Sequence, residues 1–213
     1  MRTLLFCTAY ADSPEVWGNR YLPWYQYYSQ SSLRVNNLLV IDDGSPTQPD
    51  FLQENEYHRF SDRLGRQAAH VYPGWYRSFS YGVLNGISKG FDKIIHAESD
   101  AFFFSDRIKD FVNSIDSGWH TFWCPKHNLH ESALQVICKD QFTPAKIFLN
   151  AHYSAYSGSC LDGMFPYTHV HKNFVGDRYG EYLEGIPKDA DYACQTRPGW
   201  LNKFLSNDHE KIV

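Results

Sequence analysis

The apolar positions of the chain form short continuous runs, separated by stretches that have the spacing of helices. Continuous apolar runs occupy residues 3–10, 36–46, 92–100 and 119–125, and residues 68–73 form a shorter one. Runs of this length without polar alternation are typical of strands in a sheet that is covered on both faces. The second run ends in Asp-Asp-Gly-Ser-Pro, where the Gly, Ser and Pro residues favour a turn.

Four segments between these runs have helical spacing or the residues that begin and end helices: residues 14–33, 50–67, 74–90 and 105–118. In the third segment, Trp75 and Phe79 begin a series of apolar residues four positions apart, which places them on one face of a helix. In the fourth, Ser105 is a favourable N-cap and Gly118 follows the last apolar position.

This alternation of strands and helices predicts an α/β fold with a mostly parallel central sheet flanked by helices. After residue 126 the apolar pieces become short, and Gly, Pro, His and Tyr residues become frequent. No linker or internal repeat divides the chain, so we expect a single domain over residues 1–213. Within it, residues 1–125 would build the sheet, and residues 126–213 would form an irregular part over one of its edges.

Composition narrows the classes of function. The 213 residues suffice for one core that buries roughly 70 % of the unfolded surface. A formal net charge of −4 argues against nucleic acid as a partner, because that binding depends on concentrated Lys and Arg. The five cysteines include no CxxC pair, which favours buried reduced thiols over disulfides or a zinc site. The apolar start is too short to cross a membrane, so we expect a soluble, cytoplasmic protein without a membrane span.

Two pairs of acidic residues stand where predicted strands end. Asp42 and Asp43 follow the second strand, and Glu98 and Asp100 follow the strand that begins near residue 92. Ligands of open α/β sheets bind beyond the carboxyl ends of the strands, so both pairs should face one crevice. Residues two apart in a strand point to the same side, and like charges placed there repel unless a cation lies between them. Oxygen ligands of this kind suit Mg²⁺ or Mn²⁺.

Each acidic pair also has an ordinary structural interpretation. Asp42 and Asp43 are residues that a turn and a helix cap commonly use. Glu98 and Asp100 could be a capping acid and the partner of an arginine. The sequence leaves both interpretations open.

The order of these features resembles the glycosyltransferases of the GT-A fold, in particular their family 2-like members. In that family a first apolar strand opens a nucleotide pocket, here LLFCTAY, and a second ends in an acidic turn that holds uracil or ribose, here VIDDGS. A helix then leads to a strand with an Asp-x-Asp type motif, here IIHAESDAFF, in which Glu98 replaces the first Asp. The resemblance covers about residues 3–125. The small size and divergent second half are also similar to glycosyltransferases encoded by large DNA viruses of algae (chlorella viruses).

The resemblance implies three sets of site residues. A nucleotide-sugar donor would be bound by Thr8, Tyr10, Asp42, Asp43, Arg77 and Ser99. Mn²⁺ or Mg²⁺ would be held by Glu98, Asp100 and a late histidine, for which His171 is favoured over His169. The acceptor hydroxyl would be activated by Asp162 or Asp191.

The leading hypothesis is a metal-dependent hexosyltransferase, which transfers a hexose or deoxyhexose from a UDP-sugar to a hydroxyl of a glycan or glycoprotein. Residues 1–125 would bind the nucleotide sugar, and residues 126–213 would select the acceptor and close the site. One alternative is a nucleotide-sugar or glycan-binding module of the same fold without turnover. Another is a sugar nucleotidyltransferase, but that class needs a Gly-rich basic loop after the first strand. Here that stretch is AYADSPEVWGN, which is acidic and contains one Gly.

Overall fold

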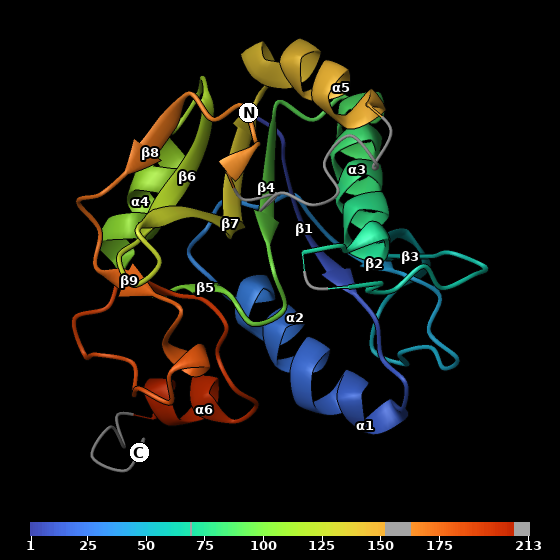
Figure 1. Cartoon of the computed structure of the whole chain (residues 1–213), viewed down its shortest axis with the longest axis horizontal. Helices are drawn as coiled ribbons and strands as arrows, with labels where there is room; N and C mark the ends of the chain where they lie inside the picture. The colour runs from blue at the N-terminus through green and yellow to red at the C-terminus, as the bar shows by residue number, and fades with distance from the viewer. Residues whose placement is uncertain (69, 152–162, 207–213) are drawn as a thin grey trace.

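A seven-stranded sheet forms the centre of the computed structural model, which describes residues 1–68, 70–151 and 163–206 (Figure 1). The strand order is β3-β2-β1-β4-β7-β6-β8. The strands are β1 (Thr3–Ala9), β2 (Asn37–Asp42), β3 (Tyr57–Arg59), β4 (Lys93–Ala97), β6 (Trp119–Cys124), β7 (Leu129–Cys138) and β8 (His169–His171). Among these strands only β7 runs against its neighbours, so the prediction of a mostly parallel sheet is confirmed.

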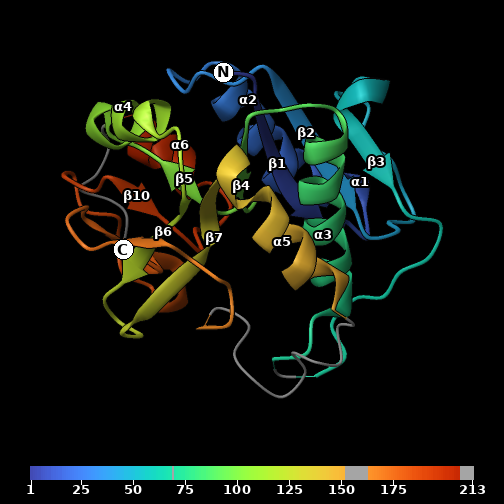
Figure 2. The same ribbon diagram turned by 90° about the horizontal axis from the view of Figure 1, so that it is seen from above.

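Helices cover both faces of this sheet (Figure 2). They are α1 (Pro14–Val16), a π-helical turn (Trp17–Tyr21), α2 (Leu22–Ser29), α3 (Pro73–Ser88), α4 (Asp106–Ser114), α5 (Phe142–Asn150) and α6 (Trp200–Leu205). Side chains alternate between the faces along a strand. Accordingly, Leu5 of β1 belongs to the core formed with α2 and α4, whereas Phe6 belongs to the core formed with α3 and α5. Both residues are fully buried.

The predicted strands β1, β2, β4 and β6 and the helices α3 and α4 are confirmed. Helix α3 lies close to the sheet because Gly82 and Gly86 face it. A Cβ on Gly82 would stand 2.5 Å from the Phe6 ring, and one on Gly86 would stand 2.8 Å from Ile94 Cδ1. Helix α4 begins as predicted, with Ser105 Oγ accepting a hydrogen bond of 3.2 Å from the Ile108 amide.

Two predicted elements are wrong. Residues 50–67 are not a helix: they contain a 3₁₀ turn at Glu54–Glu56 followed by strand β3. Residues 68–73 do not form a strand of the sheet; they contain only an isolated bridge between Ala68 and Val71. The physical reason is tertiary, because pairing with the edge of β2 makes Tyr57–Arg59 a strand that its own sequence does not indicate. The first helical segment also ends at Ser29, earlier than predicted.

The second half of the chain contributes more to the sheet than the sequence pattern indicated. Strand β7 has ten residues and lies between β4 and β6, so one continuous sheet takes strands from both sides of residue 125. A second sheet has the order β5-β10-β9, with β5 at Phe102–Phe103, β10 at Tyr192–Ala193 and β9 at Gly176–Asp177. It joins the C-terminal segment to the residues that follow the acidic turn after β4.

The four described cysteines, Cys7, Cys124, Cys138 and Cys194, are buried and free, as predicted for reduced thiols. The predicted thiol Cys160 lies outside the described residues. Throughout residues 1–68, 70–151 and 163–206, no helix has the length and apolar character needed to cross a membrane.

Candidate active site

A cavity of about 580 Å³ opens where strand β4 ends and strand β7 begins. This volume lies within the range of small-molecule binding sites. The wall consists of Arg20, Arg66, His70, Tyr72, Trp75, Glu98, Asp100, His127, Leu129, Glu131, Ser132, Ala133, Arg178, Glu181 and Gln195. Both acids of the Glu98-Ser99-Asp100 turn therefore face one cavity, at the carboxyl end of a parallel strand.

The two acids lie in a turn and not in a strand. Strand β4 ends at Ala97, the amide of Glu98 donates to Ala133 O at 2.9 Å, and the amide of Ala101 donates to Glu98 O at 2.9 Å. The side-chain alternation of a strand consequently does not apply to Glu98 and Asp100. The two carboxylates contact different side chains.

Glu98 is held by side chains of three different elements. Thr8 Oγ1 donates to its carboxylate at 2.9 Å, and Trp75 Nε1 donates to Oε1. His96 Nε2 lies 3.1 Å from the same Oε1. Burial alone would raise the pKa of Glu98, but the charge of His96 and these hydrogen bonds outweigh it, so the pKa lies below its ordinary value. Glu98 is thus a fixed anion whose oxygens are largely occupied by protein donors.

His96 is completely buried beneath this carboxylate. Its Nδ1 lies 3.2 Å from Ser132 O, an acceptor that assigns a proton to Nδ1. Nε2 faces Glu98 Oε1 at 3.1 Å, so the imidazole ring lies between the carbonyl of Ser132 and the carboxylate of Glu98.

Asp100 has a different partner, Arg20 of the π-helical turn. Arg20 Nη2 donates to Asp100 Oδ2 at 2.8 Å, and Arg20 Nε donates to Ser99 Oγ at 2.6 Å. Burial raises the pKa of Asp100 to about 6; Arg20 opposes this shift, while Glu98 and Glu131 add to it. The Asp100 side chain is 13 % exposed and that of Arg20 is 43 % exposed. Among the described residues, Arg20 is the one cation in contact with Asp100.

Asp42 and Asp43 do not line the cavity, and they have structural partners. Asp42 Oδ1 accepts hydrogen bonds from the amide and hydroxyl of Ser45 at 3.0 and 2.6 Å, and Oδ2 accepts one from Tyr57 at 2.6 Å. Asp43 accepts from the Gly65 amide at 2.7 Å and pairs with Arg77. The contacts of Asp42 are those of a turn residue, which was the alternative that the sequence left open.

Residues 62 and 65 lie against the turn that carries Asp42 and Asp43: a Cβ on Gly44 would stand 2.5 Å from Asp62 O, and the Gly65 amide donates to Asp43. Arg77, predicted to face a diphosphate, instead contacts Asp43 and Asp62, and its guanidinium lies 4.0 Å from the centre of the Phe60 ring. Tyr10 is covered by the guanidinium of Arg63, 3.7 Å from its ring centre. In this structure Thr8 reaches the site through Glu98 and Ser99 reaches it through Arg20, whereas Tyr10 and Arg77 do not line the cavity.

His171 is not brought to the acids. It lies on edge strand β8, and strands β6 and β7 separate it from β4, a distance of about 14 Å at normal strand spacing. Its Nε2 is 2.9 Å from His120 Nδ1, and the rings of His169, His120 and His171 are stacked. The predicted set of Glu98, Asp100 and His171 is therefore not assembled, and no group of three His, Cys, Asp or Glu placed to hold a metal occurs among the residues that the structure describes.

From the stacked histidines we predict that the stability of the fold decreases at acidic pH. Burial, followed by His120 and His169, lowers the pKa of His171 to about 4. Between pH 6.5 and 4 the unfolded chain thus binds a proton that the folded chain excludes, and stability falls as the pH falls. We expect wild type to lose about 2 kcal/mol more than His171→Gln between pH 7 and 4.5, measured by urea unfolding. Equal pH slopes for the two proteins would contradict the prediction.

The carboxylate of Asp191, the residue predicted as a base, already accepts several hydrogen bonds at its position just before β10. Arg107 and Ser105 donate to its carboxylate, and the Val175 amide donates to Oδ2 at 2.7 Å. Burial alone would raise the pKa of Asp191, but these donors lower it below its ordinary value. The contacts account for Asp191 as a link between α4 and the C-terminal sheet, and it does not line the cavity. The other candidate base, Asp162, lies outside the described residues.

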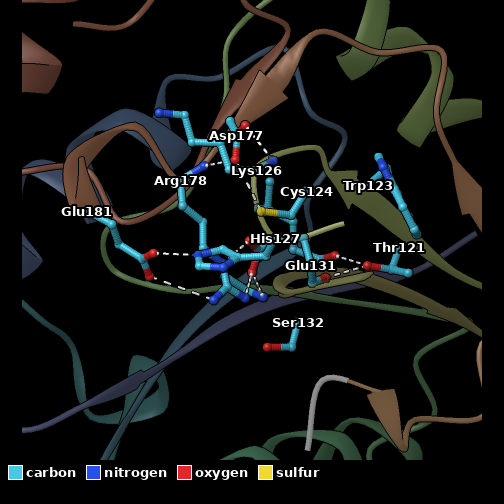
Figure 3. A network of polar contacts seen from close by, with 12 residues as sticks. Thr121, Trp123, Cys124, Lys126, His127, Glu131, Ser132, Asp177, Arg178 and Glu181 are labelled. Carbon is cyan, nitrogen blue, oxygen red and sulfur yellow. Dashed lines mark hydrogen bonds and ion pairs between the residues drawn. The ribbon is translucent and has the colours of Figure 1, made fainter. Parts of the chain in front are cut away.

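Sequence reasoning missed the residues that form the other walls of the cavity. Glu131 is 1 % exposed and accepts hydrogen bonds from Arg178 Nε at 2.7 Å and Nη2 at 3.2 Å, a bidentate pair (Figure 3). Glu181 pairs with His127 at 2.7 Å beside it. Neither these residues nor Arg20 belongs to a recognisable motif. Only tertiary contacts bring them to the acidic turn.

Comparison with known proteins agrees with this architecture. No family model matches the sequence, and no curated protein matches it. Three solved structures that share the fold are glycosyltransferases. At the sequence identities found, 9–14 %, the likeness shows the fold alone, and at that level the predicted resemblance to glycosyltransferases is confirmed.

One such structure is a glycosyltransferase involved in the glycosylation of the major capsid of the chlorella virus PBCV-1. It has a TM-score of 0.54 and 14 % identity, and the match covers 98 % of this chain and 100 % of that one. Another is the glycosyltransferase GlyE of Streptococcus pneumoniae TIGR4, with a TM-score of 0.57 and 9 % identity over 97 % of this chain. The chain spans 60 % of the GlyE structure, and 64 % of its apo form, which has 10 % identity and a TM-score of 0.55.

Proposed function

We propose that the chain transfers a hexose or deoxyhexose from a UDP-sugar to a hydroxyl of a glycan or glycoprotein. The observation that carries the proposal is the cavity beyond β4, where the Asp100 carboxylate and three arginines meet on a glycosyltransferase fold. A cavity that presents both signs of charge suits a ligand that combines an anionic diphosphate with a divalent cation.

Asp100 is the residue that would hold the cation. Arg20 contacts Oδ2, one of the two carboxylate oxygens of Asp100, whereas the oxygens of Glu98 accept from Thr8 and Trp75. Mg²⁺ commonly binds through one or two carboxylates together with substrate phosphates and water, so a single carboxylate fits an ion that arrives with the donor. When bound, such an ion supplies charge neutralisation for the departing diphosphate. Glu98 would support the turn and add negative potential without direct ligation.

The cations that would face the diphosphate are Arg20 and Arg66, in place of the predicted Arg77. Arg66 is exposed, donates to Ala68 O at 3.2 Å and lies 4.8 Å from the centre of the Tyr72 ring. Within the described part of the chain it has no carboxylate partner. A guanidinium in a cavity without a fixed anion is well suited to bind phosphate oxygens in a bidentate manner.

Residues of the C-terminal segment form the wall across from the acidic turn, and these would select the acceptor. Arg178, Glu181 and Gln195 line the cavity on that side. A glycoprotein acceptor is the favoured proposal, because the PBCV-1 protein of the same fold is described as taking part in capsid glycosylation.

A thermal-shift screen tests the donor. UDP with Mn²⁺, at ten times its dissociation constant, should stabilise the fold by about 1.4 kcal/mol and raise the melting temperature by about 4 °C. GDP and ADP at the same concentration should do less. Equal shifts for UDP and GDP would contradict the uridine assignment. Binding of UDP-sugars without any Mn²⁺-dependent donor hydrolysis would instead identify a non-catalytic binding module.

A further inference from the structure

Arg20 stands at the boundary between two hollows. It lines the main cavity of about 580 Å³ and also a smaller hollow of about 50 Å³, which is bounded by α2 and by residues 196–201. Asp100 lines both hollows as well, so the Arg20–Asp100 ion pair forms the partition between them. A movement of this one side chain would change the charge and the shape of both spaces.

The backbone that carries Arg20 is held by its neighbours, whereas its side chain is held by two hydrogen bonds, to Ser99 and Asp100. Arg20 belongs to a π-helical turn, a feature frequent at functional sites. On either side of it, Tyr21 exchanges hydrogen bonds with the Tyr10 backbone at 2.9 and 3.1 Å, and Trp17 Nε1 donates to Thr47 O at 3.2 Å. The Arg20 side chain nevertheless remains 43 % exposed. The guanidinium can therefore reorient without unfolding the turn.

Asp100 and a donor diphosphate would compete for this guanidinium. Asp100 offers one contacted oxygen, Oδ2, and Ser99 offers a neutral hydroxyl. A diphosphate carries more charge and offers a bidentate pair of oxygens, which guanidinium groups bind preferentially. Arg66 already lines the same cavity and would draw the diphosphate to this side.

We propose that Arg20 is a positioning residue that couples donor binding to cation binding. Without donor, its guanidinium neutralises Asp100 and keeps a divalent cation from that carboxylate. When the diphosphate binds, Arg20 transfers to it, and Asp100 becomes available to the cation. This inference rests on the proposed function, and it adds an order of binding: donor first, with the cation held tightly only afterwards. Because such coupling is reciprocal, the cation must also tighten donor binding by the same factor.

The test is calorimetric titration of Mn²⁺ at pH 8, with and without saturating UDP, for wild type and Arg20→Gln. Without UDP, we expect Arg20→Gln to bind Mn²⁺ at least about tenfold more tightly than wild type, because one unit charge no longer neutralises Asp100. With UDP, the gain in Mn²⁺ affinity should be large in wild type and much smaller in the variant. Asp100→Asn should bind Mn²⁺ weakly in both conditions.

Arg66→Gln is the matched control, since it removes the same charge from the same cavity but contacts no described carboxylate. Without UDP, its affinity for Mn²⁺ should stay within about twofold of wild type. The comparison distinguishes the loss of the direct contact with Asp100 from the loss of one positive charge in the cavity. If Arg20→Gln and wild type bind Mn²⁺ equally without UDP, the proposed coupling through Arg20 is wrong, even if the chain is a transferase. If wild type binds neither UDP nor Mn²⁺ with UDP, the proposed function itself has failed.

Discussion

Replacing Asp100 with asparagine is expected to lower Mn²⁺-supported turnover of the UDP-sugar by at least about 100-fold, equivalent to about 2.7 kcal/mol of transition-state stabilisation. The reason is that Asp100 lines the cavity and that Arg20 contacts Oδ2, one of its two carboxylate oxygens, whereas the carboxylate of Glu98 is bound by Thr8 and Trp75. The fold should persist, because asparagine has the same shape and burial already disfavours the charge of Asp100, whose pKa is about 6. Donor hydrolysis or transfer, assayed alongside the melting temperature, provides the measurement.

Glu98→Gln is the matched control for this experiment, since it makes the same chemical change two residues away. Glu98 is bound by Thr8, Trp75 and His96, so an amide there leaves buried donors poorly satisfied. We expect it to lower the free energy of unfolding by about 1–3 kcal/mol while the folded variant retains more turnover than Asp100→Asn. Full activity of wild type in excess EDTA, or of Asp100→Asn with Mn²⁺, would remove Asp100 from the mechanism.

The second large effect concerns stability. Asp191→Asn should lower the free energy of unfolding by about 1–3 kcal/mol, because the buried carboxylate loses charge-assisted hydrogen bonds from Ser105 and Arg107, while Arg107, 55 % exposed, keeps contact with water. It also replaces the acceptor of the Val175 amide, a hydrogen bond that joins the residue before β9 to the residue before β10. Urea unfolding at pH 7 measures this loss, and the exposed neighbour Asp189→Asn serves as a control that should change stability by less than about 0.5 kcal/mol.

The same variant tests whether Asp191 has the catalytic role suggested by family resemblance. A base would show normal stability and UDP affinity with lost turnover, whereas a structural carboxylate shows the stability loss first. Its lowered pKa, caused by Arg107, Ser105 and the Val175 amide, makes it a weak proton acceptor. Unchanged unfolding with abolished turnover would therefore overturn the structural assignment.

The sequence alone determined the elements that depend on interactions between residues close together in the chain. The apolar runs of β1, β2 and β4 need burial on both faces, and this requirement is visible in the sequence. Ser105 caps α4 because its hydroxyl satisfies an amide three residues away. The position of Glu98 and Asp100 after a parallel strand also follows from the pattern, since the carboxyl end of such a strand opens to the ligand crevice.

Tertiary structure decided which side chain each acid meets, because that depends on residues far away in the chain. Arg20 is 80 positions from Asp100 and reaches it only after the π-helical turn is fixed by the hydrogen bonds of Tyr21 to the Tyr10 backbone. Arg178 reaches Glu131 only after β7 is inserted between β4 and β6. The hydrophobic pattern of the sequence does not predict this insertion. His171 lies near the acids in neither sequence nor space, because edge strand β8 pairs with β6. The sequence by itself determined where the anionic turn lies, and long-range packing decided which cations neutralise it.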